Sequence, residues 1–133
     1  MKLTHRCEYA LLALIMLARR PENEVTSAEQ IALQQQIPKR FLHQILALLR
    51  QAKLVRASKG QRGGYALAKP ANEISIAEVV RLFDGPIAPS KAASKHFYEA
   101  SPIEREGKVL ELLGEIRQVT AEILEHRTIA DVA

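Results

Sequence analysis

Cysteine is scarce in this sequence of 133 residues, and its scarcity removes several classes of protein. Cys7 is the one cysteine, so the chain cannot form an internal disulfide. For the same reason, no zinc or iron–sulfur site can be built from several thiolates of this chain. The histidines do not recur at metal-ligand spacing on one helix, so we expect no metal site of another kind.

Long hydrophobic runs and catalytic motifs are also missing. The longest apolar run, from Tyr9 to Ala18, is shorter than the roughly 20 residues that a membrane-spanning helix needs. No secretory signal surrounds this run. The sequence shows no nucleophile paired with a base, no paired carboxylates in a motif and no cofactor fingerprint. We therefore expect a cytoplasmic protein with no membrane contact, and not an enzyme.

Negative charge is sparse in one half of the chain only. Residues 1–70 carry 12 Lys and Arg against 4 Asp and Glu, a balance of +8. Residues 71–133 carry 7 against 11, a balance of −4. This asymmetry favours a module that binds a polyanion, joined to a second element of different function. Chance asymmetry is the alternative on charge alone.

The basic half has the pattern of three helices, two of them short. Residues 3–20 are apolar nearly all round, which is typical of a helix buried on several sides. The sequence Thr26-Ser27-Ala28-Glu29 matches a capping box and predicts the start of a second helix. A third is predicted over 38–52, with apolar residues at spacings of three and four. Because about three residues join the two short helices, the pattern predicts a helix-turn-helix. The polar face of the third helix carries Lys39, Arg40, His43 and Gln44.

A glycine-rich segment follows the helix-turn-helix. Residues 55–68 have strand-like ends around a centre that carries Lys59 and Arg62, which predicts a β-hairpin or wing. A phosphate-binding loop is the competing interpretation. It is disfavoured because the Gly-Lys-Ser/Thr ending is absent and a strand follows instead of a helix.

The acidic half is predicted to hold an irregular loop and a long helix. Residues 85–102 are rich in proline and are predicted to form the irregular loop. Within them, His96-Phe97-Tyr98 either dock the loop on the core or line an effector pocket, and we favour docking. Residues 103–127 are predicted to form one helix with a stripe of apolar side chains along it. The helix is too long for the rest of the domain to bury this stripe, so we expect a second subunit to bury it. The predicted dimerisation residues are Leu112, Leu113, Ile116, Val119 and Ile123.

Several motifs together resemble the IscR/NsrR/CymR-type (Rrf2) family of winged-helix transcription regulators. They are Met1-Lys2-Leu3-Thr4 with Glu8-Tyr9-Ala10, the segment from Ile37 to Leu46, the segment from Ser58 to Leu67, and Ile74 to Val80 followed by Gly85-Pro86-Ile87-Ala88-Pro89. The resemblance covers nearly the whole chain. It implies a homodimer with crossing C-terminal helices that binds imperfect palindromes in double-stranded promoter DNA. The DNA contacts that it implies are Thr26, Ser27, Lys39, Arg40, His43, Gln44, Lys59 and Arg62.

The sequence departs from this family in one respect. Many members hold an iron–sulfur cluster with three cysteines in the loop and at the start of the long helix, whereas residues 85–133 of this chain contain none. Glu8 stands where some members have a carboxylate ligand, but one carboxylate without thiolates does not hold a cluster. We therefore predict no cofactor. Two explanations fit the resemblance: the chain represents a naturally cluster-free branch of such a family, or it is a variant whose cysteines were replaced by Ala or Ser. Cys7 is then a small buried hydrophobe, with oxidation sensing as the alternative.

The predicted fold is mainly α-helical with a small β-hairpin: a winged helix-turn-helix domain over 1–84, a loop or effector region over 85–102, and a dimerisation helix with a tail over 103–133. The predicted function is DNA-binding transcription regulation by a homodimer. The alternative is a dimeric winged-helix module that acts through a protein partner, such as an enzyme. The operator, the target genes, the signal and the direction of regulation do not follow from the sequence.

Overall fold

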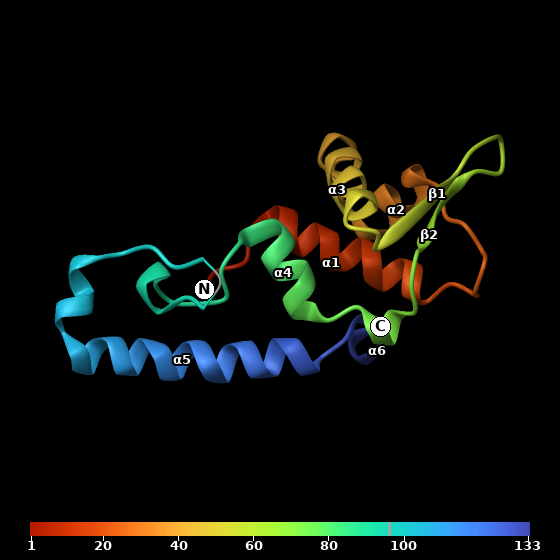
Figure 1. Cartoon of the computed structure of the whole chain (residues 1–133). Helices are drawn as coiled ribbons and strands as arrows, with labels where there is room; N and C mark the ends of the chain where they lie inside the picture. The colour runs from red at the N-terminus through yellow and green to blue at the C-terminus, as the bar shows by residue number, and fades with distance from the viewer. Residues whose placement is uncertain (96) are drawn as a thin grey trace.

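The computed structural model describes residues 1–95 and 97–133 of the chain. It consists mainly of helices, with one two-stranded hairpin that projects from one end of the molecule, and this confirms the predicted fold class (Figure 1). In chain order the elements are α1 (His5–Ala18), α2 (Ala28–Gln35), α3 (Lys39–Gln51), β1 (Val55–Ser58), β2 (Gly64–Leu67), η1 (Ala71–Glu73), α4 (Ile76–Asp84), η2 (Lys91–Ala93), η3 (Pro102–Arg105), α5 (Gly107–His126) and α6 (Ile129–Val132).

Helix α1 lies at the centre of the winged domain and packs against α2, α3, α4 and α6. Its apolar residues are buried on more than one side, as the sequence predicted for a helix without a polar stripe. The Thr4 side chain caps the helix by accepting a hydrogen bond from the Cys7 N–H at 3.2 Å. The Thr4 hydroxyl and N–H also donate to the Asp84 carboxylate, at 2.5 and 3.1 Å. The start of α1 is thereby tied to the end of α4.

The helix-turn-helix is formed by α2 and α3, and its core side is fully apolar. Leu42, Ile45, Leu46 and Leu49 of α3 are buried against α1 and α2. The capping box of α2 begins one residue later than predicted, since Ser27 is the N-cap and Gln30 its partner. Thr26 lies instead in an isolated β-bridge with Tyr65.

The hairpin stands on the helix-turn-helix. Strands β1 and β2 pair antiparallel, with Val55 opposite Leu67 and Ser58 opposite Gly64. The bridge from Thr26 to Tyr65 consists of two backbone hydrogen bonds of 2.9 and 2.8 Å. These bonds fix the start of β2 to the residue before the N-cap of α2.

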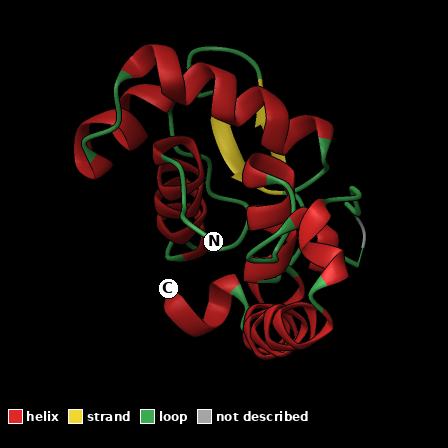
Figure 2. Cartoon of the chain, turned by 90° about the vertical axis from the view of Figure 1, so that its left-hand side faces the viewer, coloured by secondary structure: helices red, strands yellow, loops and turns green. Residues whose placement is uncertain are grey.

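The C-terminal helix is shorter than predicted, and the chain after it takes a different course from the predicted one. A 3-10 turn precedes α5, so the α-helix has 20 residues and begins at Gly107. It runs along one side of the molecule and is seen end-on beneath the other helices in Figure 2. After α5 the chain turns back, and Ile129 of α6 is fully buried in the core that contains α1. The tail of 103–133 is therefore part of the winged domain rather than of the predicted dimerisation element.

A second apolar cluster joins α5 to the winged domain. It contains Cys7 of α1, Ala77 and Val80 of α4, Ile87 of the loop and Ala121 of α5. A further link is the ion pair between Arg81 of α4 and Glu125 of α5, with 2.5 Å between nitrogen and oxygen. The loop and the long helix are thus held against α1 and α4.

Candidate nucleic-acid interface

The outer face of α3 is a row of long polar side chains near the helix N-terminus. Lys39, Arg40, His43 and Gln44 are all exposed, because the spacing of the buried leucines and isoleucine turns them away from the core. No acidic residue lies in the first turn of this helix. The structure therefore brings together the four α3 residues that the sequence predicted as DNA contacts.

Arg40 is held in place by an aromatic ring. Its guanidinium carbon lies 4.8 Å from the centre of the Phe41 ring, within the range of a cation–π contact. Phe41 in turn lies 6.2 Å from the ring of Tyr9 on α1, measured between centroids. Because α1 is the central helix, this chain of contacts fixes the direction of a cation at the start of α3.

The two predicted contacts before α2 differ in exposure. Ser27 is half-buried, and its hydroxyl accepts a hydrogen bond from the Gln30 N–H at 3.2 Å. Thr26 is only 1% exposed, because its backbone pairs with Tyr65 and its side chain lies beneath the hairpin. The Thr26 side chain is therefore not accessible to DNA in this conformation, and the DNA contact at Thr26 stays a prediction. Its position indicates that Thr26 supports the interface by holding the hairpin against the helix-turn-helix.

The hairpin tip presents the two predicted wing cations. Lys59 and Arg62 are exposed in the turn between β1 and β2. Gly60 has a φ of 103°, a conformation that side-chain-bearing residues rarely adopt, which explains a glycine in this turn. Sequence reasoning missed Arg56, which is also exposed on the hairpin. The signal was present in the alternation of buried Val55 with outward Arg56 along β1.

The first residue of β2 approaches the segment before α2 so closely that only glycine fits there. A Cβ atom on Gly64 would lie 2.6 Å from the Thr26 carbonyl oxygen and 2.7 Å from the Thr26 carbonyl carbon. Gly64 therefore couples the position of the hairpin to the helix-turn-helix.

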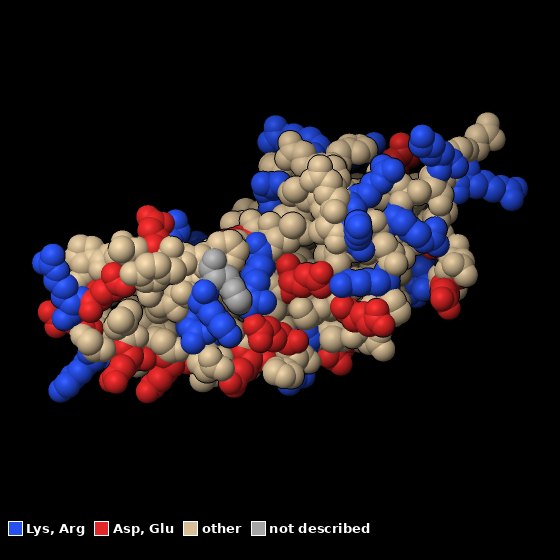
Figure 3. Space-filling view, in the orientation of Figure 1, with Lys and Arg blue, Asp and Glu red and all other residues tan. Residues whose placement is uncertain are grey.

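Charge is distributed over the surface as the two halves of the sequence predicted. Figure 3 shows Lys and Arg side chains gathered over the hairpin and the helix-turn-helix, and Asp and Glu side chains along α5 at the opposite edge. The positive side chains are thus concentrated where α3 and the hairpin are exposed. A polyanion is attracted to such a surface and repelled from the α5 edge.

Helix α5 has two apolar faces rather than the single stripe expected. Leu112, Ile116, Val119 and Ile123 are between 45% and 57% exposed and lie at spacings of three and four. Leu113 is half-buried, out of register with this row. The other four predicted dimerisation residues form one exposed apolar row, and Leu113 lies beside it; the role of all five in dimerisation stays a prediction.

The predicted aromatic segment of the loop does not dock on the core. Phe97 and Tyr98 are both exposed. The Tyr98 hydroxyl donates a hydrogen bond to Glu104, while Phe97 borders a small cavity next to α5. His96 lies outside the described residues. The docking interpretation is wrong for these two rings, because the loop packs through Ile87 and Ala92 instead.

In the part of the chain that the structure describes, Cys7 and Glu8, the side chains considered above as cluster ligands, do not lie in a group of metal-ligating side chains. Cys7 is fully buried, and its burial, together with the nearby Asp84 carboxylate, raises the pKa of its thiol to about 12. Glu8 is exposed and pairs with His5 at 3.3 Å. Within residues 1–95 and 97–133, no three His, Cys, Asp or Glu side chains are grouped so as to hold a metal ion. Over the same residues, no helix combines the length and hydropathy that crossing a membrane requires.

Comparison with known proteins places these features in a family. Residues 3–133 match the model of the Rrf2 family, described as an iron-dependent transcriptional regulator. A candidate HTH-type transcriptional regulator of Mycobacterium tuberculosis is 38% identical over all of this chain and 81% of its own length. The HTH-type transcriptional regulator CymR of Bacillus subtilis is 30% identical over all of this chain and 90% of its own.

Solved structures agree with this assignment. The structure of CymR, described as the global cysteine regulator of B. subtilis, aligns with a TM-score of 0.78 over 100% of this chain and 96% of that one. IscR of T. potens aligns with a TM-score of 0.74 and 26% identity, over 99% of this chain and 85% of that one. With a match over nearly its full length and the same winged fold, the chain belongs to the Rrf2 family of transcriptional regulators.

Proposed function

We propose that this protein is a homodimeric regulator that binds a pseudo-palindromic site in double-stranded promoter DNA through α3 and the hairpin. The observation that carries the proposal is the exposed polar face of α3 together with a cationic hairpin tip, in the half of the molecule with little negative charge. As a regulator of promoters it works in the cytoplasm, by binding and not by catalysis.

The shape of α3 suits the major groove of DNA. The helix has 13 residues, and its exposed N-terminal half offers donors that match base edges. Arg40 is suited to a guanine edge or a phosphate and Gln44 to an adenine, while Lys39 and His43 approach the backbone. Lys59 and Arg62 extend toward the flanking phosphates or the minor groove.

The exposed row on α5 is suited to a second copy of this helix. At 1.5 Å per residue, the 20 residues of α5 extend over about 30 Å. Four apolar side chains exposed along it lose water when two such helices cross. A two-fold dimer places two copies of α3 on related half-sites, one helical turn of about 34–36 Å apart or a multiple of it.

We also propose that this chain carries no iron–sulfur cluster, although the family is described as iron-dependent. The residues present do not fit such a group. Positions 92–94, 100 and 101 are Ala, Ala, Ser, Ala and Ser, so the loop supplies no thiolate. Cys7 is buried with a raised thiol pKa, which disfavours the thiolate that a metal needs. Iron analysis and an absorbance spectrum of anaerobically purified protein test this, and a brown sample with stoichiometric iron would overturn it.

Two substitutions test the assignment of α3 and the hairpin. Arg40→Ala is expected to weaken operator binding about 5–150-fold and to relax the sequence preference, since it removes a contact worth about 1–3 kcal/mol. Lys59→Ala is expected to weaken binding to operator DNA and to scrambled DNA by about the same factor, because phosphate contacts do not read bases. Fluorescence anisotropy on a selected operator and on scrambled DNA measures both. Lys108→Ala, on the exposed side of α5, is the matched control with unchanged affinity.

The alternative of a protein-binding module has one observation in its favour, the exposed rings of Phe97 and Tyr98 in the loop. The same titrations decide between the two functions. No DNA binding at 50 mM salt, combined with stoichiometric retention of an enzyme in a pull-down, would contradict the DNA-binding proposal.

A further inference from the structure

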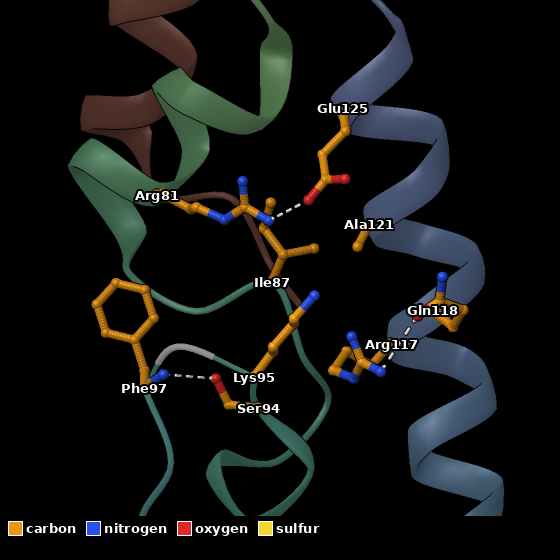
Figure 4. Close-up of a pocket in the computed structure, with 9 residues that line it drawn as sticks. All are labelled: Arg81, Ile87, Ser94, Lys95, Phe97, Arg117, Gln118, Ala121 and Glu125. Carbon is orange, nitrogen blue, oxygen red and sulfur yellow. Dashed lines mark hydrogen bonds and ion pairs between the residues drawn. The ribbon is translucent and has the colours of Figure 1, made fainter.

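A small cavity lies where the loop, α4 and α5 meet. Its volume is about 60 Å³, and Figure 4 shows its lining side chains converging from these three segments. Buried Ile87 and Ala121 form its apolar part. The charged groups around it are Arg81 of α4, Lys95 of the loop, and Arg117 and Glu125 of α5.

One of the three cations is already neutralised within the protein. The Arg81 guanidinium donates to the Glu125 carboxylate at 2.5 Å. This bond lowers the pKa of Glu125, so that the pair stays ionised at neutral pH. The pair closes one side of the cavity between α4 and α5, and its two charges cancel.

The other two cations have no such partner. Within residues 1–95 and 97–133, no carboxylate oxygen lies within 4.0 Å of a Lys95 or Arg117 side-chain nitrogen. Among the described residues, the side-chain hydrogen bond that Arg117 donates goes to the neutral Gln118 amide oxygen, at 3.2 Å. The Lys95 side chain extends from the loop into the space between the two helices (Figure 4). Lys95 is exposed, and its charge also helps to lower the pKa of Glu125. With three cations and one carboxylate around it, the cavity still has an excess of positive charge beside an apolar wall.

Like charges that face a small cavity repel one another unless an anion lies between them. The volume of about 60 Å³ is several times the roughly 10–15 Å³ that one bound water molecule requires, so the cavity has room for a carboxylate or a small tetrahedral oxyanion. Charge-assisted bonds from lysine and arginine to such oxygens are the strong class of hydrogen bond. Size and charge point to the same kind of ligand.

We propose that this cavity is a binding site for a small oxyanion, with Lys95 and Arg117 as its charged ligands and the Arg81–Glu125 pair as its closed side. An anion in this place connects the loop to α5, on the side of the helix that faces away from the exposed apolar row. The site is independent of the DNA-binding surface, so the two can be tested separately.

Isothermal titration of the purified full-length protein with sodium phosphate and, separately, sodium acetate tests the site, with ionic strength held constant by sodium chloride. Saturable binding of one anion per chain is expected. The phosphate and acetate arms show whether a tetrahedral oxyanion or a carboxylate is preferred. Lys95→Gln and Arg117→Gln are each expected to weaken binding about 10–100-fold, as removal of a charged hydrogen bond does.

Two controls locate the binding. Lys108→Gln removes an exposed cation of α5 outside the cavity and leaves anion affinity unchanged if the cavity is the site. In methyl NMR spectra, the signals of Ile87 and Ala121 are expected to move on titration, whereas that of Leu33, exposed on α2, stays in place. The proposal is overturned if neither anion binds more tightly than chloride, if Lys108→Gln abolishes the binding, or if Lys95→Gln and Arg117→Gln bind like the wild type.

Discussion

Replacing Gly64 by alanine should separate the hairpin from the helix-turn-helix. The added Cβ atom would lie 2.6 Å from the Thr26 carbonyl oxygen and 3.0 Å from the Ser27 nitrogen, both atoms of the backbone. Backbone atoms cannot rotate away as a side chain does. The strand must therefore move away from the segment before α2.

The cost of this movement follows from the bonds that cross the contact. Two backbone hydrogen bonds join Thr26 to Tyr65, at 2.9 and 2.8 Å, and both lengthen or break when the segments separate. At about 0.5–1.5 kcal/mol for each bond, Gly64→Ala should lower the free energy of unfolding by about 1–3 kcal/mol. That is a large part of the roughly 5–15 kcal/mol that stabilises an ordinary domain.

Urea unfolding followed by circular dichroism measures this change, at one fixed protein concentration because dimerisation contributes to stability. Gly114→Ala in α5 is the matched control. A Cβ atom there meets nothing within 4 Å, so alanine should stabilise the helix by about 0.5–1 kcal/mol. If Gly64→Ala unfolds within about 0.5 kcal/mol of the wild type, the account of this contact is wrong.

Three further predictions concern α5 and Cys7. Ile116→Glu should weaken the dimer about 100-fold in sedimentation experiments, because it brings an unpaired charge into the interface, whereas Leu33→Glu on α2 should leave association unchanged. Burial raises the pKa of the Cys7 thiol from 9.0 to about 12. At pH 9 the thiol of the folded protein should therefore react with iodoacetamide far more slowly than the thiol of urea-unfolded protein, as measured by mass spectrometry. Equal reaction rates would contradict this burial. The same shift favours the protonated thiol in the folded state, so its contribution to stability is complete below pH 9 and is lost as the pH rises toward 12. Cys7→Ala should remove that part of the pH dependence of urea unfolding.

The parts of the fold that the sequence predicted well are those set by local spacing. The apolar residues of α3 recur at three and four, so the exposed positions of Lys39, Arg40, His43 and Gln44 followed directly. The hairpin followed from strand-forming residues on either side of a glycine-rich turn. In both cases a short window of sequence contains the physical cause.

The errors arose where distant residues decide the structure. Both Thr26 and Ser27 can cap a helix, and the choice between them depends on the bridge to Tyr65, almost 40 residues later in the chain. Leu112 and Leu113 are equally apolar, and only the packing of α4 and the loop on α5 separates the exposed row from the inner face. The return of Ile129 to the core has no periodic signal, because α6 has only four residues.

The anion cavity was beyond prediction from the sequence for the same reason. Arg81, Lys95 and Arg117 come from three segments that show no common motif, and their convergence depends on how the loop packs between α4 and α5. The absence of thiolates from the loop, in contrast, could be read directly from the residues at 92–101.

The salt dependence of operator binding tests the central claim most directly. Lys39, Arg40, Lys59 and Arg62 from each subunit give a dimer eight exposed cations that face DNA in the proposed complex. If all eight neutralise phosphates, the logarithm of the association constant should fall with the logarithm of salt concentration at a slope of about −7. Affinity should then fall by about 10⁴-fold between 50 and 200 mM salt. A slope near zero over this range would contradict the assignment of α3 and the hairpin as the DNA-binding surface.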